Sequence, residues 1–334
     1  MERAPDLDRL LAALRSGDRA TLARCITLIE SVRPDEQRTA QELIERCLQP
    51  AGAPKVRIGI TGIPGVGKST LIDVLGLELI GRGHRVAVLA VDPSSARTGG
   101  SILGDKTRMD RLAADERAFI RPSPTSGNLG GIARRTRETV ILCETAGYDR
   151  VLIETVGVGQ NELAVDGSVD VTVLLTLAGA GDELQGIKRG IMEAADLIML
   201  TKADGDNRSR SEQARLDLRN AIALLPPRAN GKRPDVLIGS AVEQEGISTL
   251  ADRIEALASA DLASGHFMER RRAQDRERMR EAITEALLDG FHRSSEAREA
   301  LPRLEEEVMA GRMTPFRAAA ELVALFKTAS GPRP

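Results

Sequence analysis

The chain has 334 residues, of which 42% are apolar, and its 47 Lys and Arg nearly balance its 49 Asp and Glu, for a formal net charge of -2. This length accommodates one large domain with smaller additions. The charge balance excludes the broad positive field that non-specific nucleic-acid binding requires, so we expect no nucleic-acid partner. Three cysteines without C-x-x-C spacing do not indicate a disulfide framework or a zinc site. With a charged N-terminal segment and no apolar run of transmembrane length, the sequence predicts a soluble cytoplasmic protein that does not bind membranes.

The first 50 residues have apolar side chains at helical spacing, as at Leu7, Leu10, Leu11 and Leu14. This spacing predicts a short N-terminal helical extension over residues 1–50. The stretch Pro50–Pro54 interrupts the pattern and is typical of a linker into the next domain.

Residues 51–264 change to short apolar segments that alternate with helical ones, which predicts a parallel sheet covered by helices. The fold class that we expect is α/β, a P-loop NTPase with a mainly parallel central sheet, flanked by helices and extended by helices at both ends. The predicted strands are Val56–Thr61, Arg85–Val91, Arg150–Glu154, Val171–Leu177, Leu197–Thr201 and Val236–Ser240.

Two further segments have their own composition. Residues 98–131 are rich in Gly, Ser and Pro, and we interpret them as too polar for core and as a long functional connection. Residues 265–334 begin with interleaved acids and arginines and then regain apolar residues such as Ile283 and Leu287. This pattern predicts a long amphipathic helix and a helical tail, whose apolar side is either packed within the chain or used as a subunit interface.

The segment Gly62-Ile-Pro-Gly65-Val66-Gly67-Lys68-Ser69 matches the P-loop pattern G-x-x-x-x-G-K-[ST]. It follows a predicted strand and precedes a predicted helix that begins at Thr70, which is the context that phosphate binding requires. The glycines let successive N–H groups face the phosphates, Lys68 reaches the terminal phosphates, and the Ser69 hydroxyl is a ligand for Mg²⁺. These residues predict a site for a nucleoside triphosphate with Mg²⁺.

The base is indicated by Thr201-Lys202-Ala203-Asp204, which follows a predicted strand and has the form of the [NT]-K-x-D element. The Asp204 carboxylate would accept two hydrogen bonds from guanine, whereas adenine offers no such donor pair. Lys202 would lay its methylene chain along the purine. A second element, Ser240-Ala241-Val242, follows the next strand and would meet the base oxygen through its backbone. Together they predict binding of GTP and GDP.

Acidic residues at the ends of predicted strands are candidate Mg²⁺ ligands, because ligands gather at the carboxyl ends of strands in open α/β sheets. Asp92 and Glu154 end two strands, and Asp105 lies in the Gly-rich segment. Glu154 also begins an acidic-x-x-Gly element in which the N–H of Gly157 would meet the γ-phosphate. The alternatives are an N-cap or turn role for Asp92 and an ordinary strand end for Glu154.

A Gly-rich stretch after Leu177 contains Gln185 and Lys188, either of which would act on the phosphates if the loop closes. We therefore count Lys68, Glu154, Gly157, Gln185 and Lys188 as candidate catalytic residues. The alternative for Lys188 is a solvent-exposed helix start.

Taken together, these motifs resemble those of the methylmalonyl-CoA mutase-associated G-protein chaperones, the MeaB-type family, and the resemblance covers nearly the whole chain. The matching segments are Gly62–Ser69, Val91–Ser95, Glu154–Glu162, Gly181–Lys188 and Thr201–Asp204. The resemblance implies a homodimeric GTPase that binds the adenosylcobalamin-dependent methylmalonyl-CoA mutase, gates delivery of the cofactor to it and protects it. It also implies Mg²⁺ or switch roles for Asp92, Asp105 and Glu154, a partner-responsive switch containing Gln185 and Lys188, and a dimerisation arm at residues 265–334. Val242 departs from the Lys common at its position, so base contacts there would depend on the backbone.

Two other functions remain open. A metallochaperone-type GTPase for another metalloenzyme would share the fold but usually has His-rich or paired Cys and His ligands. An ATP-dependent P-loop kinase would need an acceptor site and a different base element.

Overall fold

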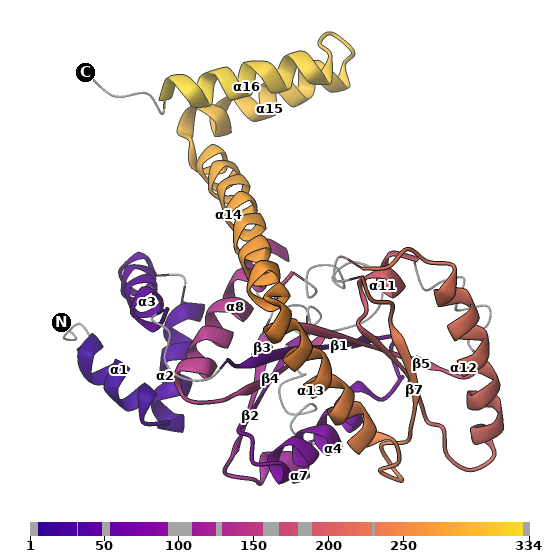
Figure 1. The fold of residues 1–334 in the computed structure, drawn as a ribbon. Coiled ribbons are helices and arrows are strands. Elements are labelled where there is room, and N and C mark those ends of the chain that lie inside the picture. The colour runs from indigo at the N-terminus through magenta and orange to yellow at the C-terminus, as the bar shows by residue number, and fades with distance from the viewer. Residues whose placement is uncertain are drawn as a thin grey trace. The chain divides into compact units, whose positions relative to one another are not determined.

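The computed structural model describes residues 6–31, 33–48, 54–92, 109–124, 129–155, 167–179, 189–228 and 231–329. The chain divides into two compact units, Met1–Arg272 and Ala273–Pro334. Figure 1 shows the first unit as a sheet with helices on both faces.

A seven-stranded sheet forms the centre of the first unit, in the order β3-β2-β4-β1-β5-β6-β7. Each neighbouring pair of strands runs parallel. Parallel strands buried on both faces are rich in Val, Ile and Leu, as β1 and β5 are here. The α/β prediction is confirmed. The strands are β1 (Val56–Gly62), β2 (Val86–Asp92), β3 (Ala118–Pro124), β4 (Arg150–Thr155), β5 (Val171–Leu177), β6 (Leu197–Thr201) and β7 (Asp235–Ile238).

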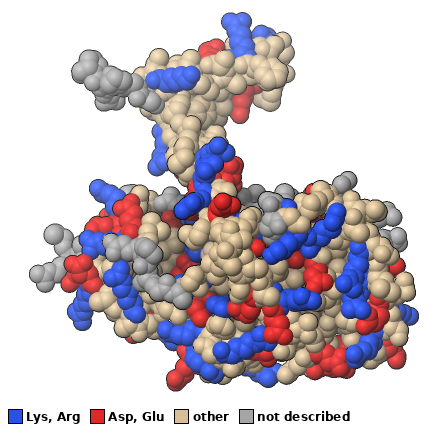
Figure 2. Space-filling view, viewed as in Figure 1, with Lys and Arg blue, Asp and Glu red and all other residues tan. Residues whose placement is uncertain are grey.

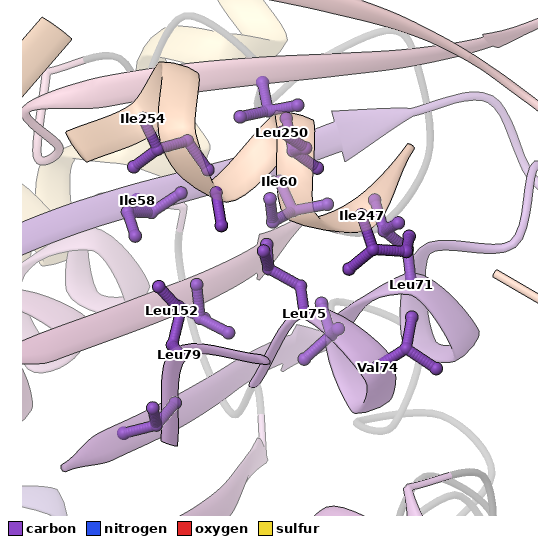
Figure 3. Close-up of a cluster of buried hydrophobic side chains, with 14 of the residues drawn as sticks. Ile58, Ile60, Leu71, Val74, Leu75, Leu79, Leu152, Ile247, Leu250 and Ile254 are labelled. Carbon is purple, nitrogen blue, oxygen red and sulfur yellow. The ribbon is translucent and has the colours of Figure 1, made fainter. Parts of the chain in front are cut away.

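One face of the sheet is covered by α4 (Lys68–Gly81) and α13 (Ile247–Ser264), with the short α7 (Asp110–Ala113) beside α4. In Figure 3, Leu71, Leu75 and Leu79 of α4 and Ile247, Leu250 and Ile254 of α13 meet strand residues such as Ile58 and Ile60. This core holds α4 firmly against the strand that precedes the P-loop.

The opposite face is covered by α8 (Leu129–Thr145), α11 (Arg189–Ala194) and α12 (Asn207–Ala223). The N-terminal helices α1 (Leu7–Arg15), α2 (Arg19–Glu30) and α3 (Pro34–Cys47) pack against α8. They share one core with it, in which Leu22 and Ile26 are fully buried. The carboxylates of Asp6 and Asp18 cap α1 and α2 by accepting backbone N–H bonds.

The second unit contains most of α14 (His266–Arg293), together with α15 (Ser295–Met309) and α16 (Pro315–Ala329). Its small core is built around Leu304, Ala318 and Leu322. Phe291 and Phe326 make an edge-to-face contact with their ring centroids 5.9 Å apart. Among the described residues, no helix has the length and apolar character needed to cross a membrane.

The space-filling view in Figure 2 shows Lys and Arg interspersed with Asp and Glu over the visible face of the first unit. Neither sign forms a broad single-charge surface on that face. The interspersed pattern agrees with the near balance of charges in the sequence.

The interpretation of residues 98–131 as a polar connection was wrong in part, because a strand and a helix lie within them. The strand β3 pairs with β2 along its length and buries Phe119. It lies at the edge of the sheet. Proline is tolerated on an edge strand, where one side of the backbone has no neighbour to bond, so Pro122 and Pro124 obscured the strand pattern.

Candidate functional site

The backbone of the P-loop has the conformation that a phosphate cradle requires. Gly62, Gly65 and Gly67 have φ of 151°, 76° and 97°. A Cβ on Gly62 would lie 2.5 Å from the carbonyl oxygen of Leu175, whereas a Cβ on Gly65 or Gly67 would meet no atom within 4 Å. The loop is therefore packed at its base and open where its N–H groups would face an anion.

Lys68 and Ser69 begin α4, so their side chains start from the positive end of the helix dipole. The Lys68 ammonium donates to the carbonyl oxygens of Gly62 at 2.9 Å and Ile63 at 3.2 Å. Burial lowers the pKa of Lys68, and the nearby carboxylate of Glu154 partly opposes that shift. Nucleotide phosphates would offer this ammonium stronger acceptors than the two carbonyls.

The Ser69 hydroxyl donates to Glu154 Oε1 at 3.0 Å. The contact arises because β4 lies next to β1, with Glu154 in register with Ile60, so the strand end faces the start of α4. A hydroxyl and a carboxylate side by side are oxygen ligands of the kind that Mg²⁺ prefers. The described residues contain no group of three or more His, Cys, Asp and Glu that would hold a metal alone.

The other predicted phosphate and metal residues are only partly described. Asp92 ends β2, the strand next to β4, and only its backbone is described. Asp105, Gly157, Gln185 and Lys188 lie outside the described residues.

The predicted base element is joined directly to the P-loop. The Thr201 hydroxyl donates to the carbonyl oxygen of Val66 at 2.7 Å, across 135 residues of sequence. Lys202 has a φ of 55°, uncommon for a residue with a side chain, and its carbonyl oxygen accepts a 2.7 Å hydrogen bond from the Asn207 amide. Sequence reasoning missed Asn207, although it stands three residues after Asp204, the residue predicted to bind the base.

The carboxylate of Asp204 is held by the second predicted base element. Ser240 is fully buried, and its hydroxyl donates to Asp204 Oδ2 at 2.5 Å. The same hydroxyl accepts from the Glu243 N–H at 3.2 Å. Ala241 packs against the core, while Val242 is 82% exposed. The hydrogen bond from Ser240 fixes the orientation of the Asp204 carboxylate.

The described site residues lie at the carboxyl ends of five strands, β1, β2, β4, β6 and β7, which is where open α/β sheets bind ligands. A P-loop between the first of these strands and a helix, an acidic residue beside the P-loop serine, and a T-K-x-D element tied to the P-loop define a P-loop GTPase.

Comparison with known proteins is consistent with that class. The family described as "Methylmalonyl Co-A mutase-associated GTPase MeaB" matches residues 22–296, and the chain belongs to this family. "Probable GTPase Rv1496" of Mycobacterium tuberculosis is 53% identical over 317 residues, which are 95% of this chain and 94% of that protein. A mouse protein, "Methylmalonic aciduria type A homolog, mitochondrial", is 46% identical over 96% of this chain and 80% of its own length. The protein is therefore a GTPase.

A solved structure described as a "LAO/AO transport system kinase" has a TM-score of 0.78 and 35% identity, and the match covers 98% of this chain and all of that one. The similarity extends over the helices at both ends as well as the sheet. The P-loop fold is thus shared along nearly the whole length.

Proposed function

We propose that this GTPase serves the adenosylcobalamin-dependent methylmalonyl-CoA mutase, and that its nucleotide cycle gates delivery of the cofactor and protects the mutase. The observation that supports this most is the match of residues 22–296 to a family described by its association with that mutase. Such a role needs a difference in affinity: the mutase must bind the GTP and GDP states unequally, because a partner that binds both equally shifts nothing.

We assign the nucleotide-binding residues from the P-loop and base-element motifs, and the positive φ angles of the P-loop glycines support the assignment. Gly62, Gly65, Val66, Gly67 and Thr70 would surround the phosphates together with Lys68 and Ser69. Lys202 and Asp204 would bind the guanine base. The backbone of Ser240, Ala241 and Val242 would contact the carbonyl oxygen of the base. Bound guanine would offer the Asp204 carboxylate two donors, whereas adenine would offer no such pair.

For the metal, we propose Ser69, Glu154, Asp92 and Asp105 as direct or water-mediated ligands. Mg²⁺ would neutralise phosphate charge when bound. Glu154 is 8% exposed, so its carboxylate already lies in a dry environment in which such charges interact strongly.

The residues Gly157, Gln185 and Lys188 remain candidates for positioning the γ-phosphate and attacking water. Their segments follow β4 and β5, the strands on either side of the P-loop strand. Slow turnover by the free protein and faster turnover with the mutase would follow if only the complex closes these segments.

We further propose that residues 265–334 are a dimerisation arm. In the second unit, Met279, Ile283 and Leu287 recur every four residues along α14 and are 59%, 51% and 58% exposed. A stripe at this spacing needs a partner to bury it, and a second copy of the chain offers the same stripe. Ile283→Lys should convert the dimer to a monomer in light scattering. Arg280→Lys, on the same helix, is the control.

The central experiment measures GTP turnover with and without purified mutase, together with co-purification of the two proteins. Binding and a changed turnover rate would support the proposal. If the mutase neither bound nor altered turnover, the chaperone role would be wrong, while the GTPase activity would stand. Competition of GDP and ATP for the free protein tests guanine specificity in the same preparation.

A further inference from the structure

Two consecutive arginines near the start of α14 contact the amino ends of three inner strands of the sheet, whose carboxyl ends face the nucleotide site. Arg271 donates two hydrogen bonds to the Asp170 carboxylate, from Nε to Oδ1 at 2.8 Å and from Nη2 to Oδ2 at 2.7 Å. Its Nη2 also donates to the carbonyl oxygen of Lys55 at 2.8 Å. The ring of Phe267 lies 4.5 Å from its guanidinium carbon and fixes the side chain from the same helix.

Arg270 makes the neighbouring contacts. Its Nη1 donates to the carbonyl oxygen of Asp170 at 2.8 Å and to Asp196 Oδ2 at 3.2 Å. Asp196 Oδ2 also accepts from the Thr172 N–H at 2.8 Å, and its other oxygen lies 3.4 Å from Arg228. The guanidinium of Arg270 therefore bridges two neighbouring strands.

The two carboxylates are deeply buried, with side-chain exposures of 2% for Asp170 and 5% for Asp196. A buried ion pair that loses one partner leaves an uncompensated charge, which is strongly destabilising. Asp170 also accepts from the Arg57 N–H at 2.8 Å, so its position is fixed to the sheet backbone. The first turns of α14 must therefore follow these strands whenever the strands move.

The strands concerned are those that carry the nucleotide site at their other ends. Lys55, Asp170 and Asp196 immediately precede β1, β5 and β6, which lie side by side in the sheet. Beyond these strands come the P-loop, the Gly-rich segment after Leu177 and the base element at Thr201. Each strand is only five to seven residues long and hydrogen-bonded to its neighbours, so the two ends are joined by a short, contiguous connection.

We propose that Arg270 and Arg271 couple the nucleotide state to helix α14. The strands β1, β5 and β6 respond to the nucleotide at their carboxyl ends, and the arginine pair transfers that response to the start of α14 at their amino ends. The proposal depends on the GTPase cycle and is independent of which partner the protein serves.

The test is hydrogen exchange, followed by mass spectrometry, on the full chain with Mg²⁺ and either GDP or a non-hydrolysable GTP analogue. In the unmodified protein, amides in the first turns of α14 should exchange at different rates in the two nucleotide states. In Arg270→Gln/Arg271→Gln that difference should disappear, while α4 still gains protection from either nucleotide.

The double arginine variant removes an ion-pair partner from each of two buried carboxylates, which can destabilise the fold. Asp170→Asn/Arg271→Gln is therefore a second variant, which removes both charges of one ion pair. Arg253→Gln is the matched control, since Arg253 pairs with Asp235 at the amino end of β7 but belongs to α13. It should keep the nucleotide-dependent difference. Equal exchange in the two nucleotide states of the unmodified protein, or an unchanged difference in the arginine variants, would overturn the proposal.

Discussion

The hydroxyl of Thr201 donates a 2.7 Å hydrogen bond to the carbonyl oxygen of Val66, so the base element and the P-loop are one connected structure. Thr201 is 5% exposed and Val66 is fully buried, which means that no solvent replaces this bond. The two elements are therefore ordered relative to each other before the nucleotide binds, which reduces the entropy cost of binding.

Removal of this bond should weaken nucleotide binding as a whole. Thr201→Val keeps the shape and deletes the donor, leaving the Val66 carbonyl buried without it. The expected increase in the Kd for GDP is roughly 5- to 150-fold, from about 1–3 kcal/mol for a buried group that loses its partner. Isothermal titration calorimetry measures it. Thr201→Ser retains the hydroxyl and should bind nearly normally; equal loss in both variants would count against the hydrogen bond as the cause.

Asp204 should determine which base is bound. Asp204→Asn replaces an acceptor by a group that also donates, and should lower guanine affinity by about 1.5–3 kcal/mol, the contribution of a hydrogen bond to a charged group. Xanthine, which presents a carbonyl where guanine has an amine, should regain affinity. Competition among GDP, XDP and ADP reads this out, with the nearby Glu243→Gln as the control. Unaltered preference for GDP would remove Asp204 from the base site.

The Ser240 side chain should act on the base only through Asp204, because its hydroxyl contacts that carboxylate at 2.5 Å. Ser240→Ala frees the carboxylate to rotate, so GDP affinity should fall by about 1 kcal/mol while the preference for GDP over ADP is retained. Ser240→Thr keeps the hydroxyl but adds a methyl group at a fully buried position. Ser240→Cys, which adds less volume, is the second comparison variant. A complete loss of preference in Ser240→Ala would show that Ser240 itself reads the base.

Glu154 should control the response to Mg²⁺. Glu154→Gln keeps the size and an oxygen beside Ser69 but removes the charge, so the Mg²⁺ concentration for half-maximal GTP turnover should rise roughly tenfold or more. Affinity for GDP in EDTA should change little. Ser69→Thr, which the P-loop pattern permits, should behave nearly as the unmodified protein does, whereas Ser69→Ala should resemble Glu154→Gln.

The three cysteines should be inert in the folded protein. Cys25, Cys47 and Cys143 are all buried, and burial raises the pKa of Cys25 to about 11 and also raises that of the other two. The thiolate is the reactive form, so native labelling by a thiol reagent should be slow at pH 8 and should accelerate as the pH rises toward 11. Cysteines in the unfolded chain ionise from about pH 9, before those in the folded protein do. The free energy of unfolding therefore falls as the pH rises from about 9 to 11. Rapid labelling of the native protein at pH 8 would contradict this.

Several parts of the structure could be predicted from the sequence because their causes are local. The P-loop was recognisable because its glycines, Lys68 and Ser69 must follow one another between a strand and a helix. Six strands were predicted because each has a run of apolar residues long enough to be buried on both faces. The edge strand β3 was missed because Arg121, Pro122 and Pro124 interrupt the apolar pattern of a buried strand. An edge strand, which has only one neighbour, tolerates them.

The sequence alone determined which chemistry to expect at the site. The groups expected to bind the nucleotide lie within a few residues of one another in Gly62–Ser69 and in Thr201–Asp204. Only the tertiary structure decided which residues support that chemistry. Ser69 meets Glu154 across 85 positions, and Arg271 meets Asp170 across 101. Those contacts depend on the order of strands in the sheet and on which helix end each strand end faces. No local pattern encodes that order, because it is fixed by how all the buried faces pack together.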